Sequence, residues 1–180
     1  MALVRLSMSE CMIDNEFLCK HSMFGGLTED ELLLIKTFLV EQEVPANTTL
    51  LKQGEPNNSV HFIVEGEVAI VRQSETNKKQ SRIITTLHAG DSFGEMELID
   101  IQRCAASVIT TCATKIVTLS NRDLYKISLQ NLKTYTMLIL NLARDISRRL
   151  RSADEMLALA KNKTTMPSSS HPDGASSSGI

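Results

Sequence analysis

Apolar residues change their spacing twice along this chain of 180 residues. In the first part they recur at helical spacing, from about residue 44 to residue 119 they follow a strand-like pattern, and beyond that helical spacing returns. The first helix is predicted to run from about Thr28 to Val40, because Thr28 and Glu31 have the pattern of a capping box. Its apolar positions are Leu32, Ile35, Phe38 and Leu39.

The middle region predicts many short strands separated by turns. Glycine, proline, asparagine and other polar residues gather at 54–58, 65–66 and 74–79, where turns are expected. Many short strands with regular turns are typical of a barrel or roll. The apolar candidates for the core are Phe62, Val64, Val68, Ile70, Ile83, Ile84, Val108, Ile109, Ile116 and Val117.

The last part of the chain predicts two helices. The run 120–123 resembles a helix start, giving a short helix to about Leu129, and a break near Gln130 and Asn131 separates it from a longer helix. A helix of about 30 residues reaches about 45 Å, longer than a small roll can cover. Its apolar residues follow the alternating spacing of a coiled coil: Ile139, Ala143, Ile146, Leu150, Ala153, Leu157 and Ala160. This seam predicts pairing with a second copy in parallel; the alternative is a helix that packs entirely on its own domain.

Charge along this long helix favours a solvated flank. Four arginines between residues 144 and 151 interleave with Asp145, Asp154 and Glu155, which argues against a patch for nucleic acid. The whole chain has a net charge of -2, with 42% hydrophobic and 22% charged residues, as in an ordinary soluble protein. Composition therefore gives no electrostatic case for nucleic acid or membrane as a partner. From residue 161 onward the chain is polar and rich in serine, and a disordered tail is predicted.

Several classes of chemistry find no support in the sequence. No apolar segment near the N-terminus has the length of a signal core or membrane span, so cytoplasmic residence is expected. The four cysteines form no CxxC pair and match no metal pattern. If Cys104 and Cys112 share one extended segment, about 26 Å separates them, too far for a disulfide, so free thiols are expected. No nucleophile and base stand at a spacing that is typical of a catalytic pair, so no catalytic residue, metal or enzymatic activity is predicted.

The run 90–108 carries the candidate chemistry. It is predicted to form a strand, a short helix begun at Gly94, and a second strand. Glycine lets a backbone approach a ligand closely, and the first turn of a helix leaves N–H groups that can face a phosphate. Glu95 beside them can accept hydrogen bonds from a sugar hydroxyl, and phosphate with ribose indicates a nucleotide. The alternative is a plain turn with a helix-initial acid, while Met96 and Leu98 are expected to pack in the core.

This run resembles the phosphate-binding cassette of the cyclic-nucleotide-binding domain family, which includes catabolite-activator-type regulators and protein kinase A regulatory subunits. The resemblance extends to 45–55, similar to the family's early turn and strand, and to 62–68, similar to its central hairpin. It implies an α+β fold: an antiparallel, double-stranded, jelly-roll-like β-roll with an N-terminal helix, a short cassette helix and a long C-terminal helix. The implied parts are an N-terminal segment (1–23), the roll (24–130), a dimerisation helix (131–160) and the tail (161–180). Asn47 stands where the family often has glycine, a mild departure because asparagine tolerates left-handed backbone.

One departure from the family pattern concerns the phosphate itself. Cys104 occupies the position of the family's phosphate-binding arginine, and Arg103 stands one place earlier. Neighbouring residues of a strand point to opposite faces, so Arg103 would need a bulge or a rearranged loop to replace the lost contact. The ligand-binding residues implied are Phe93, Gly94, Glu95, Met96, Arg103, Cys104, Ala105, Ala106 and Ser107. No cofactor is implied; the ligand expected is cAMP, cGMP or a related phosphorylated molecule.

Three functional hypotheses follow from these observations. The first is a stand-alone regulatory module that binds a cyclic nucleotide and signals through its C-terminal helix to a protein partner. The second is a structural dimerisation or scaffold domain that has lost the ligand, for which Cys104 is the best evidence. The third is a redox or haem sensor that uses Cys104 or a histidine, although the four histidines form no local cluster. A homodimer is expected, and DNA binding is not, because a tail stands where activator-type members have a helix-turn-helix domain.

Overall fold

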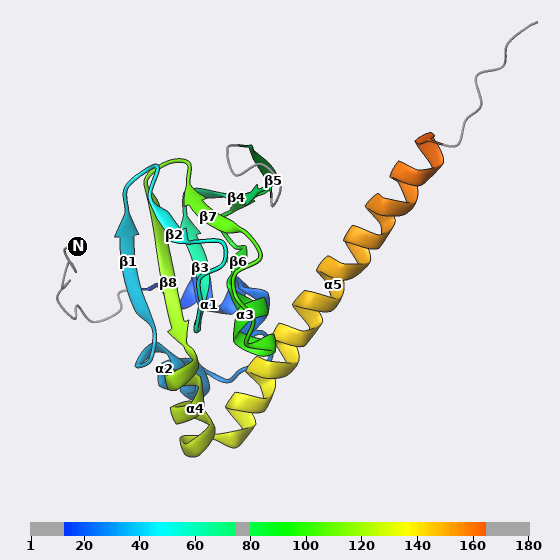
Figure 1. Ribbon diagram of the computed structural model, residues 1–180. Coiled ribbons are helices and arrows are strands. Elements are labelled where there is room, and N and C mark those ends of the chain that lie inside the picture. Colours follow the sequence, from blue (N-terminus) through cyan, green and yellow to red (C-terminus); the bar gives the residue numbers. More distant parts are fainter. Residues whose placement is uncertain (1–12, 75–79, 165–180) are drawn as a thin grey trace, which may run out of the picture. The chain divides into compact units, whose positions relative to one another are not determined.

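The computed structural model describes residues 13–74 and 80–164 (Figure 1). The helical elements are α1 (Asn15–Lys20), the 3-10 turn η1 (Ser22–Phe24), α2 (Glu29–Lys36), α3 (Glu95–Asp100), α4 (Asn121–Gln130) and α5 (Leu132–Thr164). The strands are β1 (Val40–Val44), β2 (Thr49–Leu51), β3 (Ser59–Glu65), β4 (Glu67–Gln73), β5 (Ser81–His88), β6 (Ser92–Phe93), β7 (Ser107–Thr110) and β8 (Thr114–Ser120).

The strands form two antiparallel sheets that enclose the core between them. The first has the order β1-β8-β3-β6 and the second the order β2-β7-β4-β5. Ile63 and Phe93 of the first sheet pack with Val68 and Val108 of the second in one buried cluster. This arrangement confirms the predicted β-roll.

Helix α2 begins as predicted and ends earlier than predicted. The Thr28 N–H donates to Glu31 Oε2 at 2.8 Å and the Glu31 N–H donates to Thr28 Oγ1 at 3.4 Å, which completes the capping box. The predicted end at Val40 is wrong, because α2 stops at Lys36 and Val40 begins β1, opposite Thr118 of β8. Pairing with a neighbouring strand overrides the local helical spacing.

Two residues predicted for the core lie at the surface instead. Ile83 and Ile84 of β5 are both more than half exposed. Strand β5 is an edge strand, and its register with β4 shifts between Ile70 and Val71, leaving Ile84 as the extra residue of a bulge. A bulge at a sheet edge redirects side chains away from the core. By contrast, Asn47 has a φ of 61°, as its place in the family pattern predicts.

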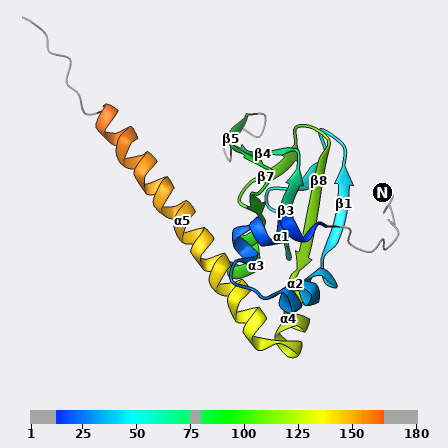
Figure 2. The same ribbon diagram turned by 180° about the vertical axis from the view of Figure 1, so that it is seen from behind.

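The N-terminal segment contains elements that the sequence pattern did not predict, α1 and η1. Asn141 of α5 is buried and fixes the second of them, donating from Nδ2 to the carbonyls of Met23 (3.0 Å) and Gly25 (2.8 Å). At the end of the roll where α2 and α4 lie together, Lys126 Nζ is 5.9 Å from the Phe38 ring (Figure 1, Figure 2). Helices therefore close this end of the roll.

The predicted break between the last two helices is confirmed at Asn131. Its N–H donates to the Ile127 carbonyl at the end of α4, and its Oδ1 accepts from the Thr134 N–H in α5 at 3.1 Å. The chain divides into a compact unit up to Asp145 and a second unit from Ile146, within α5. The predicted tail lies outside the described residues from 165 onward. Within the described ranges, no helix is both long and apolar enough to cross a membrane.

Candidate ligand site

Gly94 connects β6 to α3, and its conformation requires glycine. Its φ is 83°, and a Cβ there would lie 2.7 Å from the Ser59 carbonyl oxygen. Asn57 holds the same place, because its Nδ2 donates to the carbonyls of Ser59 (2.7 Å) and Gly94 (3.1 Å). The glycine is thus needed for close packing of α3 against β3, in addition to any contact with a ligand.

Glu95 follows Gly94 as the first residue of α3 and is buried, with 3% of its surface exposed. Burial of a carboxyl group is costly unless it is hydrogen-bonded or paired, so such a position is unusual for an acid that merely starts a helix. Met96 is 56% exposed, and the prediction that it packs in the core is wrong. Among the residues of α3 whose burial is described, Glu95 is buried, whereas Met96 and Ile99 are exposed.

The segment that leaves the cassette runs beside the loop between β2 and β3. The Gly54 N–H donates to the Cys104 carbonyl (2.8 Å), and the Cys104 N–H donates to the Glu55 carbonyl (2.9 Å). Cys104 is buried, while the exposed Arg103 donates from a terminal nitrogen to the Gly54 carbonyl at 3.0 Å. The structure therefore brings Arg103 to this loop.

The last three predicted site residues lead into β7. Ala105 is exposed, Ala106 is half-buried and Ser107 is buried at the first position of the strand. Ser107 Oγ accepts the Gln53 N–H at 3.0 Å, which ties the start of β7 to the end of β2. The cassette thus consists of β6, α3 and the start of β7, held on one side by residues 53–57.

Comparison with known sequences decides the family. A sequence model of the family described as "Cyclic nucleotide-binding domain" matches residues 41–131, half of the chain. The chain belongs to the cyclic nucleotide-binding domain family.

Relatives of this cyclic nucleotide-binding domain include regulators and a kinase. The chain is 27% identical over 137 residues to a cyclic AMP receptor protein of Thermus thermophilus, covering 76% of this chain and 61% of that protein. It is 30% identical over 112 residues to the cGMP-dependent protein kinase egl-4 of Caenorhabditis briggsae, covering 62% of this chain and 15% of the kinase. The chain therefore spans less than two thirds of either relative.

Among solved structures, a cyclic nucleotide-binding domain from Methylobacillus flagellatus is similar to this chain with a TM-score of 0.71. The two share 25% sequence identity, and the alignment covers 79% of this chain and 80% of the other. Domains of this family are regulatory modules. The long C-terminal helix belongs to the shared fold, because the match extends well beyond the roll.

His61 of β3 contacts Phe93 of the cassette. Its ring stacks on Phe93, with centroids 4.9 Å apart and planes inclined by 19°, and its Nδ1 lies 2.9 Å from Thr118 Oγ1. Its Nε2 is buried and has no hydrogen-bond partner in the described part of the chain. Burial lowers the pKa of His61 from 6.5 to about 4, so the ring is neutral at pH 7.

This lowered pKa predicts a loss of stability in mild acid. The unfolded chain takes up the proton near pH 6.5, whereas the folded chain takes it up near pH 4, so the free energy of unfolding falls as pH decreases between these values. The loss amounts to about 3 kcal/mol, at about 1.36 kcal/mol per pH unit. Urea denaturation at pH 7 and pH 4.5 should show a smaller loss for His61→Gln than for the natural chain. Equal losses in the two proteins would show that His61 is protonated as readily in the fold as in the unfolded chain.

Sequence reasoning missed Asn57, His61 and Gln53. Asn57 lies in a predicted turn, where asparagine is common for reasons unrelated to a ligand. A single histidine in a strand and a glutamine after one carry no signal of a site. Among the described residues there is no cluster of metal ligands, and Cys19, Cys104 and Cys112 form no disulfide bond.

Proposed function

We propose that this chain is a regulatory module that binds a cyclic nucleotide, or a related phosphorylated ligand, in the cassette formed by β6, α3 and β7. The observation that carries the proposal is the buried carboxylate of Glu95 directly after Gly94. A carboxylate has only acceptors to offer when ionised, so its natural partner in a ligand is a hydroxyl group. In this assignment Glu95 accepts from the ribose, and backbone N–H groups near Gly94, Ala105 and Ala106 face the phosphate.

The names of the relatives indicate which nucleotides should be tested as ligands. The Thermus thermophilus protein is a cyclic AMP receptor and the Caenorhabditis briggsae protein is a cGMP-dependent kinase, so both nucleotides are candidates. The two ligands share the ribose and the cyclic phosphate, and they differ in the base. Glu95 and Gly94 would serve either ligand equally.

Output is proposed to pass through α5 to a second copy of the chain and to a protein partner. In the first part of α5, the buried face consists of Thr134, Leu138, Asn141 and Leu142. The predicted seam lies on another face, where Ile139 is half-buried and Ala143 is exposed. The seam is separate from the face of α5 that packs on the roll and is therefore available to a partner. A ligand that shifts α5 would change the position of the seam residues that the partner contacts. A coupling of about 1 to 3 kcal/mol is typical of such a link.

Calorimetric titration of the full chain tests this proposal. We expect saturable binding of cAMP or cGMP below millimolar concentration, and a loss of about tenfold or more in affinity for Glu95→Ala, since a hydrogen bond to a charged group contributes about 1.5–3 kcal/mol. Ile99→Ala serves as the matched control, because Ile99 is an exposed residue of the same helix and lies outside the predicted set of ligand-binding residues. Equal affinities of the natural chain and Glu95→Ala would make the ribose assignment wrong.

Cys104 favours one alternative, a dimerisation or scaffold domain without a ligand. The family's phosphate-binding position holds a buried thiol, and Arg103 contacts the Gly54 carbonyl. In that case neither nucleotide produces heat at millimolar concentration, while the chain still pairs through α5. The same titration, combined with a measurement of molecular mass, therefore distinguishes the two functions.

A further inference from the structure

Strand β7 separates from its neighbour β4 at the end of the cassette segment. The register of these antiparallel strands extends as far as the pair formed by Val71 and Ser107. If the register continued by two residues on each strand, Gln73 would be opposite Ala105. The strand β7 begins at Ser107, so Ala105 and Ala106 lie outside the sheet.

The side chain of Gln53 occupies the position opposite Gln73. The Gln73 N–H donates to Gln53 Oε1 at 2.8 Å, and Gln53 Nε2 donates to the Gln73 carbonyl at 3.4 Å. Two residues that face each other in a hydrogen-bonded pair of an antiparallel ladder exchange the same two bonds through their backbones. The amide of Gln53 therefore completes the β4 ladder in place of a backbone partner.

The direction of the next residue shows which neighbouring strand this amide replaces. Strand β4 lies between β5 and β7. The Ser74 N–H donates at 2.9 Å to the carbonyl of Gln80, the residue directly before β5. Backbone groups of successive residues in a strand point to opposite edges, so those of Gln73 point to the β7 side. Gln53 thus takes the bonds that Ala105 would make if β7 were longer.

The backbone around Gln53 also fixes both ends of the segment that leaves the ladder. The Gln53 N–H donates to Oγ of the buried Ser107 at 3.0 Å. At the other end, the Gly54 N–H donates to the Cys104 carbonyl at 2.8 Å, and the Cys104 N–H donates to the Glu55 carbonyl at 2.9 Å. Residues 53–55 therefore hold the two alanines between Cys104 and Ser107 from both sides.

The N–H groups of Ala105 and Ala106 stay available as a result. Within the described ranges, neither group donates to a backbone carbonyl. Ala105 is exposed and Ala106 is half-buried, and a backbone N–H without a protein partner binds water or a ligand. If Ala105 paired with Gln73, its N–H would be consumed by the Gln73 carbonyl.

We infer that Gln53 is a positioning residue of the ligand site, which pairs with Gln73 and thereby keeps the N–H groups of Ala105 and Ala106 free for the ligand phosphate. The inference rests on the proposed function, because it names the residue that holds the phosphate-facing segment of the same site. Gln53 acts through this segment and does not bind the ligand, since both groups of its amide are bonded to Gln73.

Amide hydrogen exchange of the full chain without ligand, measured by NMR, is the first test. Gln53→Leu keeps the size of the side chain and removes both amide groups. We expect Ala105 to pair with Gln73 in this variant, because unpaired backbone groups at a strand edge favour a backbone partner. Exchange at Ala105 should then slow by about tenfold, as one new hydrogen bond predicts. A merely structural role would loosen the segment and make this exchange faster.

Calorimetric titration of the same proteins with cAMP is the second test. We expect Gln53→Leu to bind cAMP about tenfold more weakly or worse, because one charge-assisted hydrogen bond to the phosphate is lost. Gln42→Leu is the matched control, since it makes the same change at an exposed glutamine of β1 in the other sheet. The control should alter neither the exchange at Ala105 nor the affinity.

The outcomes separate this inference from the proposed function. If the natural chain binds cAMP and Gln53→Leu binds it equally well, the inference is wrong and the proposed function stands. Weaker binding with faster exchange at Ala105 also overturns the inference, because Gln53 would then only stabilise the loop. If the natural chain binds neither cAMP nor cGMP, the proposed function is wrong and the inference falls with it. If circular dichroism shows that Gln53→Leu does not fold, Gln53→Ala is judged by the same two measurements.

Discussion

Replacing Cys104 by arginine is expected to raise the affinity of the chain for cAMP by about 30-fold or more. The expectation follows from the family pattern, in which an arginine at this position pairs with the cyclic phosphate. One partner of a desolvated charge pair contributes roughly 2 to 5 kcal/mol, which corresponds to about 30-fold to several-thousand-fold in affinity. The two hydrogen bonds between residues 54–55 and 104 hold the backbone in place, so the substitution changes the side chain and keeps the path of the chain.

Cys104→Met is the control for size, since it lengthens the side chain without adding charge. An arginine variant that melts at the same temperature as the natural chain and binds cAMP no better would contradict the assignment of position 104 to the phosphate.

The parts of the fold that the sequence predicted are those with local causes. The capping box at Thr28, the break at Asn131 and the left-handed Asn47 each depend on a few neighbouring residues. The errors arose where distant partners decide the outcome. Val40 joins a strand because β8 pairs with it, and Ile84 is exposed because it forms a bulge at a sheet edge. Apolar character alone shows that a side chain favours burial, and register decides whether it is buried.

The candidate site likewise contains residues that the sequence predicts and residues that only the fold reveals. Gly94 and Glu95 are neighbours in the sequence, so their shared role could be proposed from the chain alone. Asn57 and Gln53 contact residues that lie far from them in the sequence: Asn57 donates to the Gly94 carbonyl and the Gln53 N–H donates to Ser107 Oγ. The residues around Asn57 and Gln53 do not distinguish them from other polar residues near a turn. Their contacts with the cassette become visible only in the folded chain.

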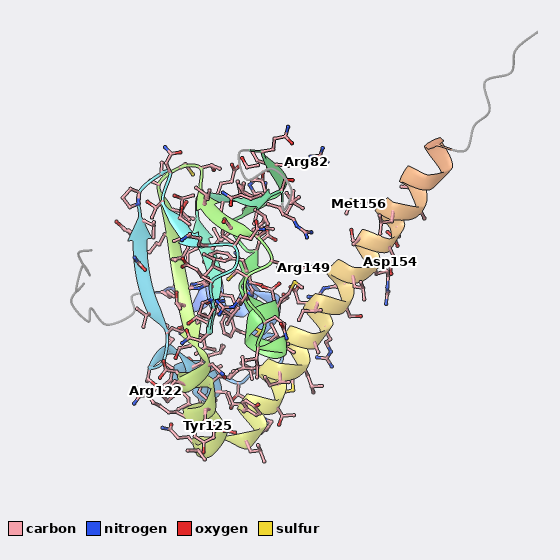
Figure 3. The ribbon with its side chains drawn as sticks, in the orientation of Figure 1. Arg82, Arg122, Tyr125, Arg149, Asp154 and Met156 are labelled. Carbon is pink, nitrogen blue, oxygen red and sulfur yellow. The ribbon has the colours of Figure 1, made fainter. Side chains whose placement is uncertain are left out.

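The seam on α5 leads to the second large prediction, that Leu150→Glu converts a dimer into a monomer. Leu150 is 62% exposed and Leu157 is 60% exposed, and both belong to the stripe with coiled-coil spacing. Figure 3 shows Asp154 and Met156 projecting from the same part of the helix. The surface of this part outside the stripe therefore carries both charged and apolar side chains. Burying a leucine contributes about 1.5–3 kcal/mol, and each dimer would lose two such side chains and gain two facing carboxylates.

Sedimentation equilibrium of the full chain tests this prediction. We expect the natural chain to have the mass of a dimer and Leu150→Glu to have that of a monomer, with a dissociation constant raised by more than about 100-fold, because two leucine contacts together contribute about 3 kcal/mol or more. Ser152→Glu adds the same charge to an exposed position outside the stripe and should leave the dimer intact. A natural chain that sediments as a monomer would mean that the seam binds a different protein and not a second copy of the chain. A Leu150→Glu variant that remains a dimer would place the interface on another surface and separate dimerisation from α5.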